Sequence, residues 1–297
     1  MKRSGLVAIC GRPNVGKSTL LNNLVGKKVS IISPKPETTR DNIRGILTEK
    51  DTQIVFIDTP GIHKPHDLLG KIMLTRAQSS LMEADIILFL IEEGGAFRDD
   101  DMNIIERLPK PEEHKPVVLI INKSDMIKKK EAILPLIEKA VKLYPFKEII
   151  PMSAKNAKHI EEMLRTVRSY LKEGEFVFPE SSFTDKGEEF MAEEIIREKI
   201  LECTRHEIPH ASAVNITRFT KKAETNKIHI EATIFIEKSS QKGIVVGKGA
   251  EMIKKIREMS QKEIQKALNC KVRLELWVDV KEKWKNNPES LADIGYA

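Results

Sequence analysis

Residues Gly11–Ser18 read GRPNVGKS. The stretch fits the pattern G-x-x-x-x-G-K-[ST] and follows an apolar run, 6–10, which predicts a buried strand. Its two glycines allow successive backbone N–H groups to point into one concavity, and the helix predicted from Lys17 adds the positive end of its dipole. The sequence therefore predicts a phosphate-binding loop. A chance glycine-rich turn is the alternative, and the strand before and the helix after the loop argue against it.

The side chains of this loop carry phosphate and metal chemistry. Lys17 would reach the β- and γ-phosphates of a nucleotide. Ser18 would give one oxygen to Mg²⁺, a hard cation that takes its other ligands from phosphates and water. The residues predicted here to bind the nucleotide are Gly11, Arg12, Pro13, Asn14, Val15, Gly16, Lys17, Ser18 and Thr19.

Composition indicates about two globular domains. The chain has 297 residues, of which 40% are hydrophobic and 32% charged, enough to bury two cores. Its net charge of +6, with the basic excess in residues 211–297, suggests an acidic partner, although a bland basic surface would explain it equally well.

The cysteines and the apolar runs bear on the compartment. Cys10, Cys203 and Cys270 are far apart and lack C-x-x-C spacing, which disfavours a disulfide framework or a zinc site and fits a reducing cytoplasm. The longest apolar runs fall far short of the roughly 20 residues of a transmembrane helix, and the N-terminus does not resemble a signal peptide.

Apolar runs alternate with helical segments through the first half of the chain. They cover residues 6–10, 53–57, 86–91, 117–121 and 148–152. This alternation predicts an α/β domain with a mostly parallel sheet covered by helices, in which ligands bind beyond the carboxyl ends of the strands. Each candidate motif follows one of these runs.

The tetrapeptide Asp58-Thr59-Pro60-Gly61 follows the second run. Asp58 would emerge beside the phosphate loop, where its carboxylate could hold Mg²⁺ through water. Gly61 would offer its N–H to the γ-phosphate, and Thr59 and Pro60 are assigned to the same site. DTPG alone is also an ordinary turn, but together with the phosphate loop it indicates a Walker-B aspartate.

Two further loops are predicted to choose the nucleobase. Asp125, in Asn122-Lys123-Ser124-Asp125, can accept from the ring N–H and the exocyclic amine of guanine, a donor pair that adenine lacks. Asn122 would tie this loop to the phosphate loop and the base, and the stem of Lys123 would lie over the purine. Ser153-Ala154-Lys155 would place a backbone N–H on the guanine oxygen. Each peptide alone would be read as a turn or helix cap.

The array of these motifs resembles the translation-factor-related GTPases. The resemblance implies that residues 36–40 (PETTR) form a first switch, in which a threonine closes on Mg²⁺ only when the γ-phosphate is present. Thr39 is the predicted threonine and Thr38 the alternative, and a plain surface loop is also compatible with the local sequence. A second switch would cover about 61–69. The predicted metal ligands are Ser18, Thr39 and Asp58.

One departure from the Ras-like pattern concerns hydrolysis. Ile62 follows DTPG where Ras-like proteins place a glutamine that orients the attacking water, so intrinsic hydrolysis should be slow. Asn14 stands where related GTPases hold a potassium ion, whose charge could replace an arginine finger. Asn14 as a residue that only shapes the loop is the alternative. The residues predicted to act in catalysis are Asn14, Lys17, Thr39 and Gly61.

Helical periodicity ends after Leu171, and residues 172–186 gather Pro, Ser, Gly and charge. The predicted organisation is a GTPase domain over 1–174, a linker over 175–187 and a second domain over 188–297. In the second domain, patterns predict helix, strand, strand, helix, helix and strand, with strands at 211–219, 228–236 and 272–280. A helix over 250–269 is expected to break near Ser260.

Gly247-Lys248-Gly249-Ala250 opens a helix that carries further basic residues. With this element order, it resembles an α+β KH module of type II, whose GXXG loop clamps about four unstacked nucleotides against an apolar groove. Alanine at the fourth position is expected to tolerate a helical start. Core residues beside a solvated lysine face would be the alternative. The residues assigned to RNA are Ile244, Val246, Gly247, Lys248, Gly249, Ala250, Ile253, Lys254 and Arg257, and Ile256 is a further candidate for the groove.

Over essentially its whole length the chain resembles the Era-type GTPases of bacteria, through the G-domain motifs and the stretches Cys203–Ala211, Lys238–Ile256 and Leu274–Trp284. The resemblance implies binding of GTP and GDP, binding of single-stranded RNA at the 3′ end of small-subunit ribosomal RNA, and assistance to maturation of the small ribosomal subunit. It also implies a cytoplasmic monomer, with peripheral membrane attachment in some members.

Two rival functions come from other classes. The protein could be chiefly an RNA-binding assembly scaffold, in which slow GTP hydrolysis by the N-terminal domain only times the assembly. It could instead be a metabolic enzyme that uses ATP through its phosphate loop, which the NKSD motif opposes.

Overall fold

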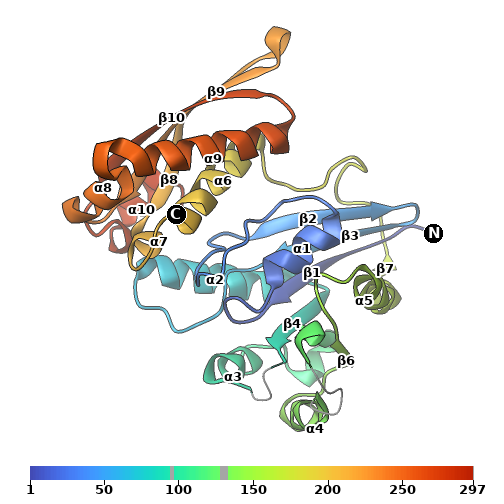
Figure 1. Ribbon diagram of the computed structural model, residues 1–297. Helices are drawn as coiled ribbons and strands as arrows, with labels where there is room; N and C mark the ends of the chain where they lie inside the picture. Colours follow the sequence, from blue (N-terminus) through green and yellow to red (C-terminus); the bar gives the residue numbers. More distant parts are fainter. Residues whose placement is uncertain (94–96, 128–132, 297) are drawn as a thin grey trace. The chain divides into compact units, whose positions relative to one another are not determined.

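The computed structural model describes residues 1–93, 97–127 and 133–296 (Figure 1). The chain divides into two compact units. Unit 1 consists of Met1–Ser30, Thr39–Lys64 and Met73–Asp185, and unit 2 consists of Ile31–Thr38, Pro65–Ile72 and Lys186–Ala297. Most of the predicted first switch and part of the second therefore pack with the C-terminal unit, which the sequence did not indicate.

Unit 1 is built on one sheet. Among the described residues the sheet has seven strands in the order β2-β3-β1-β4-β5-β6, with β7 beside β1. The strands are β1 (Arg3–Cys10), β2 (Ile43–Glu49), β3 (Thr52–Asp58), β4 (Ile86–Glu92), β5 (Val117–Asn122), β6 (Glu148–Pro151) and β7 (Lys172–Glu173). The pairs from β3 to β6 are all parallel, whereas β2 and β7 are antiparallel to their neighbours. The predicted mostly parallel sheet is confirmed.

Helices cover the sheet because its central strands are apolar on both faces. The helices of unit 1 are α1 (Lys17–Val25), α2 (Leu68–Glu83), which begins in unit 2, α3 (Asp99–Ile105), α4 (Leu134–Leu143) and α5 (Ala157–Tyr170). Ala8 and Cys10 of β1 belong to a buried cluster with residues of α2, α3 and α4, and α1 contacts α5. The long apolar runs are thus explained by burial on two sides.

The sequence did not predict β2, the edge strand. Its residues, IRGILTE, mix charge with apolar side chains, so they show neither a continuous apolar run nor strict alternation. Gly45 lies where β2 passes α1, and a Cβ there would stand 2.6 Å from Leu21 Cδ1. The glycine is therefore needed for close packing of helix on strand.

Residues 175–185 run along this edge of unit 1. Gln53 Nε2 donates to the carbonyl of Phe178 (2.8 Å), the N–H of Ile46 donates to the carbonyl of Phe183 (3.0 Å), and Gly45 forms an isolated bridge with Thr184. These residues belong to the stretch for which the sequence predicts a linker, and the compact units divide at 185/186.

Unit 2 contains a three-stranded sheet in the order β10-β9-β8, with β9 and β10 parallel and β8 and β9 antiparallel. Its elements are α6 (Glu188–Cys203), α7 (Ile208–Ala211), β8 (Ala213–Lys222), β9 (Lys227–Ile236), α8 (Ser239–Val246), α9 (Glu251–Leu268), β10 (Lys271–Val280) and α10 (Pro288–Ile294). Two helices lie between β9 and β10 as the predicted order has it, but they are α8, which the sequence did not predict, and α9, rather than two halves of a helix over 250–269. The short α7 precedes β8, and α10 follows β10.

One face of this sheet is covered by α6, α8 and α9. Alternate residues of β9, from Ile228 to Ile236, are at most 1% exposed and share a core with these helices. The expected break near Ser260 is wrong, because α9 runs unbroken from Glu251 to Leu268. Ser260 is fully buried within it, and a single small residue costs a helix too little to end it. None of the helices in the described part of the chain has the length and apolarity that crossing a bilayer requires.

Candidate functional site

The strand order gathers the nucleotide motifs of unit 1. The phosphate loop follows β1, DTPG follows β3, NKSD follows β5 and Ser153-Ala154-Lys155 comes just after β6. Because β3, β1, β4, β5 and β6 lie in this order and run parallel, their carboxyl ends meet at one edge of the sheet.

The phosphate loop requires glycine for steric and conformational reasons. Gly16 has φ +103°, and a Cβ there would stand 2.3 Å from Asn122 Nδ2. Gly11 has φ +151°, and a Cβ there would stand 2.5 Å from the Leu90 carbonyl oxygen. Any side chain at either position would push the phosphate loop away from the strands that hold it.

Lys17 lies inside this loop and is 6% exposed. Its Nζ donates to the carbonyls of Gly11 (3.0 Å) and Arg12 (3.1 Å). Burial lowers the pKa of Lys17 below its ordinary value, and the charge of Asp58 opposes this shift. The ammonium group therefore lies beside the backbone concavity where phosphate oxygens would replace the carbonyls as partners.

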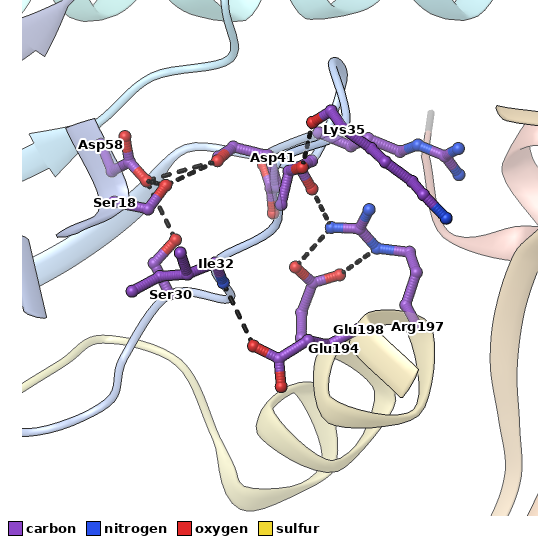
Figure 2. A network of polar contacts seen from close by, with 12 residues as sticks. Ser18, Ser30, Ile32, Lys35, Asp41, Asp58, Glu194, Arg197 and Glu198 are labelled. Atoms are coloured by element: carbon purple, nitrogen blue, oxygen red, sulfur yellow. Dashed lines mark hydrogen bonds and ion pairs between the residues drawn. The ribbon is translucent and has the colours of Figure 1, made fainter. Parts of the chain in front are cut away.

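Hydroxyl groups converge on the carboxylate of Asp58 (Figure 2). Its Oδ2 accepts from Ser18 Oγ (2.7 Å), Ser30 Oγ (2.9 Å) and Thr39 Oγ1 (3.4 Å), and the Ser18 and Thr39 hydroxyls are 3.1 Å apart. Its Oδ1 is buried with no hydrogen-bond partner among the described residues. An oxygen-only set with one unsatisfied buried carboxylate oxygen fits a hard divalent cation such as Mg²⁺.

The ionisation of Asp58 depends on this environment. Burial raises its pKa above the usual range, while Lys17 and the hydroxyls of Ser18, Ser30 and Thr39 lower it. A bound divalent cation would favour the carboxylate form, since a metal ion reverses the local desolvation effect. Ser30 was not predicted, and nothing in its local sequence, KKVSIIS, distinguishes it from a loop serine.

The two threonines of the first switch have different partners. Thr39 lies at Asp58, whereas Thr38 Oγ1 donates to the carbonyl of Lys35 (2.6 Å). Of the two alternatives that the sequence left open, Thr39 is the one that the structure places beside the carboxylate.

The segment after Asp58 is packed against the phosphate loop. A Cβ on Gly61 would stand 2.9 Å from the backbone nitrogen of Pro13. The N–H of Ile62 donates to the Gly11 carbonyl (3.4 Å), and the Ile62 side chain is 1% exposed within the core of unit 1. Thr59, assigned to the nucleotide, instead donates its hydroxyl to the Ile9 carbonyl (3.0 Å). That hydroxyl therefore secures the strand end.

The base-reading loops are joined by Asn122. Its Nδ2 donates to the Val15 carbonyl (2.7 Å) and its Oδ1 accepts from the N–H of Ala154 (2.8 Å), so one buried side chain connects three loops. A hydrogen bond from Ser153 is the main cause that lowers the pKa of Asp125 below its usual range. The Asp125 carboxylate is thus ionised at neutral pH.

Unit 2 contains the second candidate site, beside the GKGA loop. Gly247, Gly249 and Ala250 all have positive φ, and a Cβ on Gly247 would stand 2.7 Å from Met252 Cβ. The expectation of a helical start at Ala250 is wrong, because this residue has φ +63° and ψ +21° and precedes the first turn of α9. An alanine in this region costs about 1–2 kcal/mol relative to right-handed backbone.

A groove of about 720 Å³ runs between α9 and β10. Its lining includes five of the residues assigned to RNA and six that the sequence analysis missed. The predicted members are Gly249, Ala250, Ile253, Lys254 and Arg257, and the others are Gln261, Arg273, Leu274, Glu275, Leu276 and Trp277.

These six residues come mostly from β10, for which the sequence predicts an alternating strand and no contact with RNA. Trp277 is 46% exposed and lines the groove. A tryptophan that falls on the outward-facing positions of an alternating strand is the signal that could have indicated that β10 lines a binding surface. Ile244 is 54% exposed, whereas Ile256 is fully buried in the core. The suggestion that Ile256 lines the groove is therefore wrong, since it faces α6 and the sheet core.

Also within unit 2, α6 and the turn after it hold residues 31–38. Arg197, fully buried, donates through Nε and Nη2 to the two carboxylate oxygens of Glu194 (2.7 Å each), and its Nη2 also donates to the Thr38 carbonyl (Figure 2). Glu198 Oε1 accepts from the N–H of Ile32 (3.2 Å), and Lys35 Nζ donates to two carbonyls near the end of α6. A helix of the C-terminal unit therefore holds residues 31–38, which include the first three residues of the predicted first switch.

The second switch has partners in the same unit. Asn286, in the turn before α10, accepts from the N–H of Leu68 at the start of α2 (3.1 Å). Lys285 Nζ lies 3.7 Å from Asp67 Oδ2. The N–H of Leu68 has no partner within its own helix, as is usual in a first helical turn. Asn286, more than 200 positions later in the chain, supplies the missing acceptor.

Comparisons with known proteins agree with this geometry. Residues 6–123 match a family described as 50S ribosome-binding GTPase, and residues 207–285 match the KH domain family. The chain is similar to Era in a crystal structure with MgGDPNP and nucleotides 1506–1542 of 16S ribosomal RNA, at 42% identity, a TM-score of 0.95 and full coverage of both chains. It is also similar to a variant of Aquifex aeolicus Era bound to GDP·AlF4⁻, at 42% identity, a TM-score of 0.94 and 99% coverage of each chain. The chain therefore belongs to the Era family of GTPases.

Proposed function

We propose that this protein is a magnesium-dependent GTPase that binds the single-stranded 3′ end of small-subunit ribosomal RNA and assists assembly and maturation of the small ribosomal subunit. The observation that carries the proposal is the presence of two sites in one chain. One is a phosphate loop joined by Asn122 to a loop with a guanine-reading carboxylate. The other is a groove bounded by a GKGA loop.

The residues of unit 1 would divide the work of hydrolysis. Mg²⁺, held by Ser18, Thr39 and Asp58, would neutralise charge on the phosphates. Lys17 and the backbone N–H groups of the phosphate loop would bind the β- and γ-phosphates. The N–H of Gly61, which is packed on Pro13, would donate to a γ-phosphate oxygen. These donors are fixed before the reaction, so they cost little reorganisation in the transition state.

We further propose slow intrinsic hydrolysis that potassium accelerates. The Ile62 side chain is buried in the core and cannot orient water, so a cation beside the β–γ bridge would have to supply the missing charge. Asn14 is exposed in the phosphate loop with φ +65°, a place from which its side-chain oxygen could reach such a cation.

Hydrolysis is expected to be several-fold faster in KCl than in NaCl at equal ionic strength. The measurement is phosphate release under saturating GTP and Mg²⁺. Asn14→Ala should bring the rate in potassium down to the rate in sodium. Equal rates of the unchanged protein in the two salts would remove the potassium proposal while leaving GTP hydrolysis itself intact.

The bound nucleotide, GTP or GDP, would change RNA binding in the groove through the predicted switches. Thr39 packs in unit 1 beside Asp58, and Thr38, the residue before it, packs in unit 2. GTP with Mg²⁺ would draw Thr39 toward the metal, and the peptide chain would pass this displacement to Thr38 and its partner Arg197. The proposal is supported by the hydrogen bonds at each threonine.

RNA binding in the groove is tested by two charge reversals on α9. Lys254 lines the groove and its neighbour Lys255 does not. We expect Lys254→Glu to weaken binding of a 3′-end rRNA oligonucleotide about tenfold through lost phosphate contact and new repulsion, and Lys255→Glu to have a much smaller effect. Fluorescence anisotropy at two salt concentrations measures both.

The difference in RNA affinity between Lys254→Glu and Lys255→Glu tests whether RNA binds in the groove. Equal losses would show that only overall charge matters, and no loss in either would exclude the groove. Failure of the unchanged protein to distinguish the rRNA 3′ end from a scrambled oligonucleotide would contradict the proposed RNA target.

We also propose a cytoplasmic monomer. The free thiols of Cys10, Cys203 and Cys270 are compatible with a reducing compartment. Peripheral membrane attachment, which the family resemblance implies for some members, is part of the same proposal and would be measured by co-sedimentation with vesicles.

A further inference from the structure

Glu92 stands between the phosphate loop and the base-reading loop of unit 1. It is the last residue of β4, the strand that lies between β1 and β5 in the sheet, and it is in register with Asn122. A side chain at this point rises from the rigid sheet with the phosphate loop on one side and NKSD on the other.

The two carboxylate oxygens of Glu92 have different partners. Oε2 accepts from Arg12 Nη2 of the phosphate loop (2.5 Å), and Oε1 accepts from Lys123 Nζ of NKSD. Lys123 Nζ also donates to the Asn14 carbonyl (3.1 Å), so it holds the phosphate loop at a second point. Burial raises the pKa of Glu92, but the hydrogen bonds from Lys123 and Arg12 outweigh it and keep the pKa below its usual range.

A second carboxylate fixes Arg12 from the side of α3. Asp101 is 2% exposed, its Oδ1 lies 3.5 Å from Arg12 Nε, and its Oδ2 accepts from the N–H of Arg98 (3.0 Å). The guanidinium of Arg12 therefore faces Glu92 and Asp101, and Arg12, predicted to bind the nucleotide, would do so through its backbone. The side chain sets the position of the loop.

This arrangement bears on how guanine is held. Lys123 has a left-handed backbone (φ +62°) and a long, flexible side chain that loses rotamer freedom when it is held in one place. If the ammonium end of Lys123 is already held before the nucleotide binds, ordering the side chain over the purine costs less binding free energy. Glu92 provides that fixed end from a strand, where side chains are placed more accurately than on loops.

We propose that Glu92 is a positioning residue for guanine nucleotides, which fixes Lys123 over the base and Arg12 in the phosphate loop with one carboxylate. This inference rests on the proposed binding of GTP and GDP. Because neither contact involves the γ-phosphate, Glu92 should stabilise GDP and GTP equally. It should also affect substrate binding and the transition state alike, which raises KM without lowering kcat.

The test compares Glu92→Gln with Glu93→Gln, which removes the same charge one residue later. Glu93 forms no ion pair with Arg12 or Lys123 in the described part of the chain. Glu92→Gln should increase the dissociation rates of fluorescent GDP and of a GTP analogue by about tenfold, the effect of losing roughly one charge-assisted hydrogen bond. Glu93→Gln should leave both rates near the original values.

A double-mutant cycle separates positioning from a general structural defect. In a Lys123→Met background only the contact of Glu92 with Arg12 remains to be weakened, so Glu92→Gln should there increase the dissociation rate by clearly less than tenfold. A full tenfold effect in that background, a lower kcat with unchanged KM, or an unchanged dissociation rate in Glu92→Gln would each overturn the inference. Absence of guanine-nucleotide binding by the unchanged protein would instead contradict the proposed function itself.

Discussion

Replacing Asp125 with asparagine is expected to change the preferred nucleotide from GTP to xanthosine triphosphate. The ionised carboxylate of Asp125 would accept from two N–H donors of guanine, and an asparagine amide would present a donor where guanine also has one. Xanthine carries a carbonyl at that position, so the amide matches it. We expect GTP affinity to fall at least about a hundredfold, since two hydrogen bonds to a charged acceptor are lost.

Calorimetry with GDP, XDP and ADP measures this prediction. Ser124→Ala, one residue earlier in the same loop, should keep the preference for GDP because Ser124 is held by its backbone: its N–H donates to the Met152 carbonyl (3.1 Å) and its carbonyl accepts from the N–H of Ile127 (3.2 Å). An Asp125→Asn protein that still prefers GDP would show that the carboxylate does not read the base. Preferential binding of ADP by the unchanged protein would revive the ATP-using alternative.

Removing the Arg197 side chain is expected to destabilise unit 2 and release the first switch. Glu194 would keep a buried charge without its partner, and loss of one member of a buried ion pair typically costs about 3–5 kcal/mol. Arg197→Ala should therefore lower the unfolding midpoint by several degrees. Arg205→Ala removes the same side chain from an exposed position after α6, and it should change the midpoint little.

A second variant separates stability from coupling. Glu194→Gln combined with Arg197→Gln leaves no unpaired charge, so most of the stability should return while the guanidinium contact to the Thr38 carbonyl is lost. In the unchanged protein we expect RNA affinity to differ between GDP and a non-hydrolysable GTP analogue, and in the double variant we expect this difference to disappear. Equal RNA affinity in the two nucleotide states of the unchanged protein would exclude the coupling.

Much of the fold could be predicted because local patterns and burial agree. Four of the five apolar runs became the central strands β1, β3, β4 and β5, since burial on both faces demands apolar side chains along the strand. The fifth became β6, a partly exposed strand at the edge of the sheet. The edge strand β2 was not predicted because its residues, IRGILTE, form neither a continuous apolar run nor a strict alternation, and β7 has only two residues. The unbroken helix at Ser260 shows that tertiary packing can override a weak local preference.

The residues of the nucleotide site could likewise be predicted from the sequence. Lys17, Asp58 and Asp125 lie in short motifs whose spacing reflects backbone requirements, such as glycine at positive φ in the phosphate loop. The helix-opening GKGA loop was also visible, although the left-handed conformation of Ala250 was not. The groove wall on β10 was missed because an alternating strand conceals which of its faces is covered.

The chemistry of the protein can be predicted from its residues alone: a glycine-built phosphate loop, a carboxylate suited to guanine and a basic helix after a glycine turn. These are local features, because backbone conformation and hydrogen-bonding groups depend on residues close together in the chain. The folded structure was needed to find that Ser30 and Thr39 share Asp58, that Glu92 joins Arg12 to Lys123, and that Arg197 holds Thr38. Each of these contacts joins residues 19 to 159 positions apart. Burial at a sheet edge or under a helix, rather than any spacing in the sequence, brings them together.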